Sequence, residues 1–292
     1  MFALECEISV AEWPQFEALL EAFGALAITQ SDGDVDVFAE PDTVVETPWS
    51  RFKAEALFAD IAEADTIEQA LRQALPGIQL ARRPIDGEAW AERWKEGWTP
   101  LSFSGGVCVC PSWLEPPPTA RHVVSLDPGQ AFGTGSHQST GLCIDWLVAQ
   151  APFGDRTLLD YGCGSGILAL VAARLGARNI KAVDIDARAV LVTRENIELN
   201  HAQDDIEVSL PGELAATPVQ MLVANILLGP LLKLAPEFVA RVAPGGHIAM
   251  AGLLQTQIDS VLDAYTSDFE FEPAVVRDEW ALLAGRRRPA QA

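Results

Sequence analysis

Two acidic residues and three glycines near the middle of the chain have the types and spacing of a nucleoside-binding site. The run DYGCGSG over residues 160–166 ends one apolar stretch, and Asp184 ends the next. Glycine has no Cβ, so the backbone can turn sharply there and a ligand can lie against it. A carboxylate after the second stretch can accept hydrogen bonds from both hydroxyls of a ribose. The pattern predicts a nucleoside-containing cofactor at Gly162, Gly164 and Asp184.

The glycine spacing distinguishes between two cofactors of this kind. A dinucleotide site spaces its glycines as G-x-G-x-x-G, with a helix N-terminus beneath the pyrophosphate, whereas residues 162–166 read G-x-G-x-G. Asp160 lies two positions before Gly162, where its charge would repel a pyrophosphate but attract the ammonium and sulfonium groups of S-adenosylmethionine. The residues therefore favour S-adenosylmethionine. An NAD-dependent oxidoreductase and a tight turn without any ligand remain the alternatives.

A second glycine-rich segment, residues 126–140, precedes this site. Three glycines surround Phe132, which predicts a loop that can close over a ligand and press the ring on it. We expect Phe132 and Thr134 of this loop to contact the cofactor. Thr140 opens the helix predicted to end near residue 150, where its hydroxyl meets a ligand or caps the helix. His137 is interpreted as structural, because no partner for a catalytic histidine is evident.

The candidate catalytic residue is Asn225, at the end of another apolar run, residues 221–224. Its side chain offers a carbonyl acceptor and an amide donor. Acceptors at this point can orient the N–H groups of an incoming amine, so that its lone pair faces a methyl group in line. The alternative is an asparagine that only pins a loop.

The elements that must position these residues alternate regularly from residue 157 onward. The pattern predicts strands at 157–160, 180–184, 206–210, 221–224 and 247–251, helices at 167–175, 187–199, 231–242 and 258–265, and two terminal strands. Such alternation is typical of an α/β fold with a parallel, doubly wound, Rossmann-like sheet and helices on both faces. Ligands of such sheets bind outside the carboxyl ends of the strands.

The first 84 residues predict a small separate domain. Strand patterns at 2–10, 25–30, 35–38, 53–58 and 78–81 enclose helical patterns at 12–23 and 65–75. The order β-α-β-β-α-β is that of a ferredoxin-like α+β fold. Residues 85–104 predict a linker helix in which three tryptophans share one face, either packed against a domain or docking a substrate. The second domain would then span residues 105–292.

Composition narrows the class of protein further. The chain has 292 residues and a formal net charge of −21, which repels nucleic acid phosphates and attracts basic partners. No signal peptide and no apolar run of membrane-spanning length is evident, so we expect a cytoplasmic protein. An odd number of scattered cysteines fits free thiols and no metal site; they are Cys6, Cys108, Cys110, Cys143 and Cys163.

Four runs together carry a family resemblance: LDPGQAFGTGSHQST, LLDYGCGSGILAL, AVDID and VANILLGPL. In this order and spacing they closely resemble the PrmA family of ribosomal-protein methyltransferases, which modify the eleventh protein of the large ribosomal subunit. The resemblance covers nearly the whole chain. It implies a class I S-adenosylmethionine methyltransferase fold with a small N-terminal domain that captures the substrate. By the match, Thr140, Gly162, Asp184 and Asn225 stand at cofactor-binding positions.

The resemblance also implies a reaction and a partner. We expect methyl transfer to lysine ε-amines and to the N-terminal α-amine of a basic ribosomal protein. We further expect a monomer that meets no membrane and meets nucleic acid at most indirectly, through the ribosome. One alternative is a methyltransferase acting on adenine or glutamine, which the residues after Asn225 disfavour because they lack the usual proline pair and aromatic. Another is a non-catalytic ribosome-assembly factor on the same fold.

Overall fold

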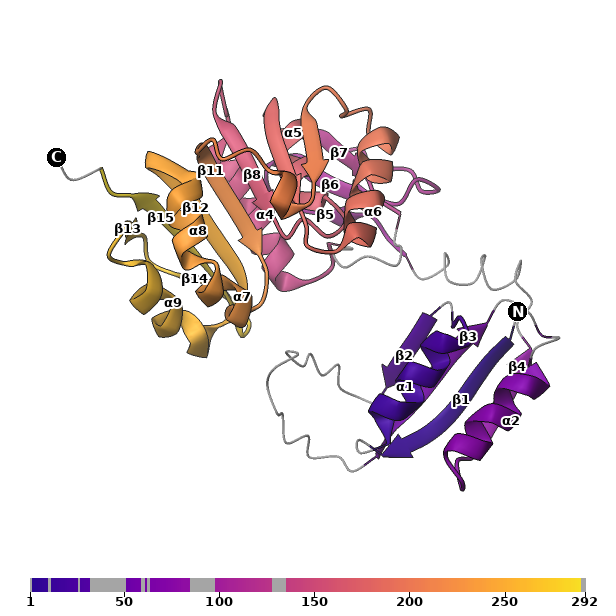
Figure 1. Cartoon of the computed structure of the whole chain (residues 1–292). Coiled ribbons are helices and arrows are strands. Elements are labelled where there is room, and N and C mark those ends of the chain that lie inside the picture. Colours follow the sequence, from indigo (N-terminus) through magenta and orange to yellow (C-terminus); the bar gives the residue numbers. More distant parts are fainter. Residues whose placement is uncertain are drawn as a thin grey trace. The chain divides into compact units, whose positions relative to one another are not determined.

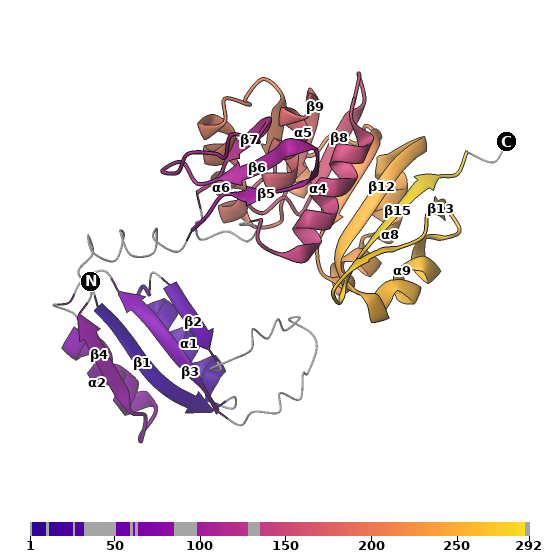
Figure 2. The same cartoon turned by 180° about the vertical axis from the view of Figure 1, so that it is seen from behind.

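The chain forms two compact units, Met1–Trp98 and Thr99–Ala292 (Figures 1 and 2). The computed structural model describes residues 2–9, 12–25, 27–31, 51–58, 61, 64–84, 98–127 and 135–289. The predicted linker helix therefore lies mostly outside the described residues, as does the strand predicted at 35–38. Residues 101–102, at the end of that predicted linker, pair with a strand of the second unit. The domain boundaries at 84 and 104 stay predictions.

Unit 1 contains a four-stranded antiparallel sheet in the order β2-β3-β1-β4. Its elements are β1 (Phe2–Ser9), α1 (Trp13–Ala22), β2 (Ala27–Ser31), β3 (Arg51–Phe58), α2 (Ala64–Ala74) and β4 (Leu80–Pro84). Both helices cover the same face of the sheet (Figure 2), where Phe16 of α1 and Leu71 of α2 pack on alternate residues of β1 such as Phe2 and Ile8. This element order and sheet order are those expected of a ferredoxin-like fold.

Unit 2 contains an eight-stranded sheet in the order β10-β9-β8-β11-β12-β15-β13, with β14 paired to β15. The strands are β8 (Thr157–Tyr161), β9 (Asn179–Val183), β10 (Ile206–Ser209), β11 (Val219–Asn225), β12 (Val242–Leu254), β13 (Phe269–Phe271), β14 (Val275–Arg277) and β15 (Trp280–Arg287). The first five strands in space run parallel, as predicted. The prediction of two terminal strands was wrong, because three strands form this end of the sheet: the long β15, antiparallel to β12, and the short β13 and β14 paired to β15.

Six helices of unit 2 cover the two faces of this sheet. They are α4 (Gln138–Gln150), α5 (Ile167–Arg174), α6 (Ala187–Leu199), α7 (Leu228–Lys233), α8 (Ala235–Arg241) and α9 (Ile258–Tyr265). The single helix predicted over 231–242 is in fact two short helices. Pro236 lacks an N–H and its ring clashes with the carbonyl four residues back. The helix therefore stops at Leu234 and restarts with Pro236 in its first turn.

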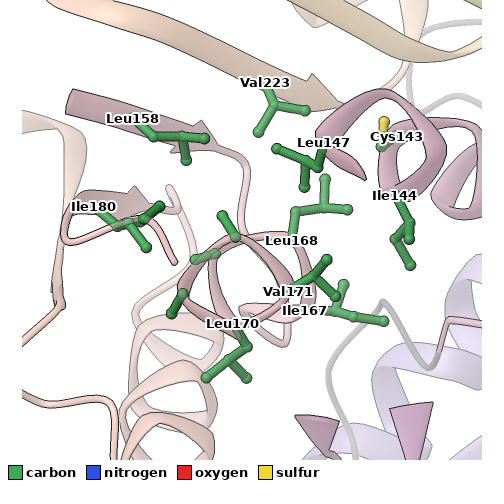
Figure 3. Packing of buried hydrophobic residues seen from close by; sticks show 14 of the residues in the cluster. Cys143, Ile144, Leu147, Leu158, Ile167, Leu168, Leu170, Val171, Ile180 and Val223 are labelled. Carbon is green, nitrogen blue, oxygen red and sulfur yellow. The ribbon is translucent and has the colours of Figure 1, made fainter. Parts of the chain in front are cut away.

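The core lies on both faces of the sheet, because successive residues of each strand point to opposite sides. Leu158 and Val223 face α4 and α5, whereas Leu159 and Leu222 face α7, α8 and α9. Figure 3 shows the first of these layers, with Leu168 of α5 beside strand residues and α4. The packing fixes α5 against β8 and β9, and α4 against α5 and against β11, β12 and β15.

A smaller sheet completes unit 2. It consists of β5 (Leu101–Ser102), β6 (Val107–Cys110) and β7 (His122–Ser125), in that order. The turn η2 (Ser104–Gly106) joins its first two strands. Two further short helical turns lie in connections of the main sheet. They are η3 (Pro211–Glu213), between β10 and β11, and η4 (Gln255–Gln257), between β12 and α9.

Candidate active site

The glycine-rich turn predicted from residues 160–166 lies at the carboxyl end of β8 and leads into α5. Gly162 N–H and Cys163 N–H both donate to the Val183 carbonyl of the neighbouring strand, at 2.8 and 3.0 Å. Gly162 has φ +77°, and a Cβ built on it would lie 2.3 Å from Cγ2 of Ile226. Only glycine fits this close approach. Because β9 and β11 lie on opposite sides of β8, the turn occupies the switch point of the sheet, where ligands of such folds bind.

Asp184 follows the end of β9 and its carboxylate holds the same turn. Its Oδ2 accepts a hydrogen bond from Gly164 N–H at 2.9 Å, and its Oδ1 accepts one from Asp186 N–H at 3.0 Å. The side chain is half-buried. A carboxylate has about four acceptor sites, so each oxygen keeps one for a ligand hydroxyl. The structure therefore brings together Gly162, Gly164 and Asp184 at one edge of the sheet.

Asp160 is buried beneath this turn. Its Oδ2 accepts a hydrogen bond from Ala169 N–H of α5 at 3.0 Å, while its Oδ1 has no partner among the described residues. Burial raises the pKa of this carboxyl to about 7; the hydrogen bond from Ala169 lowers the pKa and the charge of Asp184 raises it. A cation near an unpartnered buried carboxylate oxygen would favour its charged form. The site therefore fits a ligand that carries positive charge.

Two buried polar residues of α6 fix the carbonyls of the same turn. Thr193 Oγ1 donates to the Gly164 carbonyl at 2.8 Å, and Asn196 Nδ2 donates to the Ser165 carbonyl at 2.9 Å. Neither residue was predicted from the sequence. The available signal was weak: two polar residues three positions apart, on the side of the predicted helix 187–199 that would face the core.

The structure also joins two residues that the sequence singled out separately. Asn225 Nδ2 donates to Thr140 Oγ1 at 3.2 Å. Asn225 ends β11, and buried Thr140 lies in the first turn of α4. The expectation that Thr140 opens this helix was wrong by two residues, because α4 begins at Gln138 with His137 as its N-cap. The pair lies at the same carboxyl edge of the sheet as the glycine-rich turn.

His137 has a structural role in the described contacts. Its Nδ1 lies 2.7 Å from Ser139 Oγ and accepts a hydrogen bond from Ser139 N–H at 3.3 Å. Its ring meets the Trp280 ring edge-on, with 4.3 Å between centroids. Burial lowers the pKa of this histidine, which favours the neutral ring that an accepting cap needs.

The two other predicted cofactor contacts, Phe132 and Thr134, lie outside the described residues. All five cysteines are buried free thiols. Within the described part of the chain, no three His, Cys, Asp or Glu side chains are grouped closely enough to hold a metal ion. No helix there is both long enough and apolar enough to span a membrane.

The fold and the site define a class I S-adenosylmethionine-dependent methyltransferase. In the unit 2 sheet, five parallel strands are followed by β15, which runs antiparallel between β12 and β13. The glycine turn and the acidic residue lie at the switch point of this sheet. The family described as ribosomal protein L11 methyltransferase (PrmA) matches residues 2–288. The chain belongs to this family, whose members are protein methyltransferases.

Individual relatives agree with this assignment. The chain is 38% identical over 290 residues to the ribosomal protein L11 methyltransferase of Nitrosococcus oceani, covering 97% of this chain and 98% of the relative. It is 40% identical over 276 residues to that of Pseudomonas putida strain W619, covering 93% and 94%. Among solved structures, the ribosomal protein L11 methylase from Lactobacillus delbrueckii subsp. bulgaricus is similar, with a TM-score of 0.60 and 29% identity over 65% of this chain and 100% of that one.

Proposed function

We propose that this protein transfers methyl groups from S-adenosylmethionine to ribosomal protein L11, at lysine ε-amines and at the N-terminal α-amine. The observation that carries this proposal is the meeting of the glycine-rich turn, Asp184 and the Thr140–Asn225 pair at one edge of the unit 2 sheet. The relatives named for L11 methylation support the choice of substrate.

The residues of this edge suit the proposed cofactor. Gly162 and Gly164 would let its nucleoside lie against the backbone, and Asp184 would accept the ribose hydroxyls. Thr140 and Asn225 would add polar contacts, as would Thr134 of the preceding loop, and the ring of Phe132 would press on the ligand. The orphaned Oδ1 of Asp160 suits the positive charge of the cofactor. When bound, S-adenosylmethionine supplies a methyl group activated by its sulfonium.

Asn225 would orient the amine that receives the methyl group. Its Nδ2 is engaged by Thr140, which fixes the plane of the amide and leaves Oδ1 as an acceptor. An Oδ1 held in this way can take an amine N–H, so that the nitrogen lone pair points along the line of attack. The amine must first lose a proton, since a free lysine has a pKa of about 10.4. We propose that burial of the amine in the site lowers this pKa and that water takes the proton.

Unit 1 would capture the basic substrate. Residues 1–98 contain 20 Asp and Glu against 7 Lys and Arg, whereas residues 99–292 contain 21 against 13. Unit 1 thus carries −13 of the net charge of −21 on one third of the chain. Such a field attracts a basic protein and speeds its encounter. L11 is a ribosomal protein, so we propose that the reaction takes place in the cytoplasm.

The proposed function is tested by intact-mass spectrometry of L11 after incubation with this protein and S-adenosylmethionine. We expect mass increases in multiples of about 14 Da, the mass that one methyl group adds in the proposed transfer, and fragmentation should place them on lysines and the N-terminus. Raising the salt concentration should increase the KM for L11 far more than the KM for S-adenosylmethionine, because screening weakens the attraction of unit 1. Cofactor binding without any mass change would contradict the proposal and indicate a non-catalytic assembly factor.

A further inference from the structure

The hairpin formed by β14 and β15 is joined to α4 through Arg277. Arg277 Nη2 donates to Asp145 Oδ2 at 2.6 Å, and Asp145 Oδ1 accepts a second hydrogen bond from Ser104 Oγ at 2.5 Å. Both partners of the ion pair are about two-thirds buried, with side-chain exposures of 40% and 34%. A single carboxylate on α4 therefore ties the helix to the C-terminal hairpin and to η2.

Gly141 provides the space through which Arg277 reaches Asp145. A Cβ built on Gly141 would lie 2.7 Å from Nη1 of Arg277. Positions 141 and 145 are one turn apart on the same face of α4, so the guanidinium lies across the helix between them. Glycine near a helix start lowers helix stability relative to alanine. The contact with Arg277 gives a physical reason for a glycine at this position.

A second contact joins the same two segments. The Trp280 ring at the start of β15 meets the ring of His137 edge-on, and His137 is the N-cap of α4. The hairpin thus holds α4 at its cap and again at Asp145, about two turns further on. Thr140, which accepts the hydrogen bond from Asn225, lies between these two points of attachment.

We propose that Arg277 is a positioning residue for the site: it sets the place of the first turn of α4, and through this turn the Thr140 hydroxyl that meets Asn225. The inference rests on the proposed roles of Thr140 and Asn225 in holding the cofactor. Arg277 itself need not touch cofactor or substrate. The space beside Gly141 and the ion pair with Asp145 fix its guanidinium. The Trp280–His137 contact holds the N-cap of α4 against the same hairpin.

Four variants test this inference: Arg277→Met, Arg277→Lys, Gly141→Ala and the double variant Gly141→Ala/Arg277→Met. The primary readout is the Kd for S-adenosylhomocysteine by calorimetry, which needs no turnover. We expect Arg277→Met to raise this Kd roughly tenfold, the equivalent of a lost interaction of ordinary strength. Gly141→Ala should raise it by a smaller factor, because its methyl displaces only the far end of the Arg277 side chain. Arg277→Lys should recover part of the affinity by keeping a cation beside Asp145.

The double variant distinguishes positioning from general stabilisation. Once the guanidinium of Arg277 is gone, the added methyl of Gly141→Ala makes only an ordinary contact with Phe103, at 3.7 Å. It should therefore cause no further loss of affinity and should raise the melting temperature by about 2–4 °C. Arg178→Met serves as the matched control, since Arg178 also pairs with one aspartate, at 2.7 Å, but precedes β9 at the opposite edge of the sheet. Its Kd should equal that of the unaltered protein.

The outcomes separate this inference from the proposed function. If Arg277→Met and Gly141→Ala lower the melting temperature but bind S-adenosylhomocysteine like the unaltered protein, Arg277 is structural only and the inference is wrong. Additive losses of affinity in the double variant would also overturn it. If the unaltered protein fails to methylate L11 while the expected pattern of Kd values is seen, the proposed function is wrong and the positioning role stands.

Discussion

Two helices begin at the same edge of the unit 2 sheet, and they are held there in different ways. The start of α5 is held by residues of its own neighbourhood: Asp160 lies nine positions before Ala169, and Asp184 lies twenty positions after Gly164. The start of α4 is held from far along the chain. Asn225 is 85 positions from Thr140, and Arg277 is 132 positions from Asp145.

The two turns therefore differ in function: the α5 turn holds the ligand, whereas the position of the α4 turn can be adjusted. The α5 turn is fixed by hydrogen bonds to its backbone N–H and C=O groups and by glycines that admit no side chain, so almost any change there should disturb cofactor binding. The α4 turn is fixed by side chains, and its place depends on packing of the C-terminal hairpin. We expect changes at the α5 turn to weaken cofactor binding directly and strongly, and changes at α4 to weaken it less, by shifting Thr140 relative to Asn225.

The largest expected effect is that of Gly162→Ala. The new Cβ would overlap Cγ2 of Ile226, and alanine is strained at φ +77°. Strain of about 1–3 kcal/mol plus overpacking of similar size would weaken S-adenosylhomocysteine binding by roughly a hundredfold or more. Calorimetry measures this Kd directly.

Gly154→Ala is the matched control for Gly162→Ala. Gly154 is also in the left-handed region, at φ +58°, but nothing lies within 4 Å of its Cβ position. It should lose some stability and keep its cofactor affinity. Equal affinities for the two variants would show that the close approach to Ile226 does not matter.

The next largest expected effect is a pH dependence of the free energy of unfolding that Asp160 causes. With its pKa raised to about 7, the folded carboxyl keeps its proton to higher pH than the unfolded one, which titrates near about 4. Between these values the folded chain binds more protons, so this group lowers the free energy of unfolding as pH rises, levelling off above about 7. Asp160→Asn keeps an acceptor for Ala169 but does not titrate.

From pH 5 to pH 8, the free energy of unfolding of Asp160→Asn should therefore rise relative to that of the unaltered protein, by on the order of 2 kcal/mol. Denaturant unfolding of both proteins at the two pH values measures the difference. A difference that does not change with pH would mean that the buried carboxyl titrates in its ordinary range.

The smallest expected effect is that of Thr193→Val, which removes the hydroxyl held 2.8 Å from the Gly164 carbonyl and keeps the shape. We expect a loss of about 1 kcal/mol in stability and a few-fold weaker cofactor binding. Thr193→Ser should restore affinity. Thr157→Val, which removes a hydroxyl bound to Gln220 at the other end of β8, should not affect the Kd. Weakened cofactor binding in Thr157→Val would contradict the expectation that only changes at the carboxyl edge of the sheet affect the Kd.

The sequence predicted the parts of the site that depend on local spacing. Helix 187–199 has the predicted bounds, and Gly162, Gly164 and Asp184 meet at the expected edge, because a turn and the next strand follow from glycine and apolar patterns. Thr140 and Asn225 were singled out, but not their pairing. Arg277 and Thr193 were missed, because an arginine or a threonine has no local pattern that tells which distant helix or turn it will contact.

The fold, like the site, was predicted where it depends on local patterns and missed where it depends on distant contacts. The alternating strands and the βαββαβ order of unit 1 follow from periodicity. The break at Leu234 was missed although Pro236 was visible, because a proline is tolerated in the first turn of a helix and its effect depends on where that helix starts. The antiparallel end of the sheet depends on the pairing of β15 with β12, about 40 positions earlier in the chain, and on two strands of three residues each. Periodicity specifies neither.

The central claim, that this edge is a methyl-transfer site in which Asn225 orients the amine, is tested most directly with Asn225→Ala. The measurement compares kcat on L11 with the Kd for S-adenosylhomocysteine, with Asn179→Ala at the opposite edge as the control. We predict that kcat falls by on the order of a hundredfold, while the Kd rises about tenfold at most, because an orienting contact acts chiefly in the transition state. A folded Asn225→Ala with unchanged kcat would contradict the account.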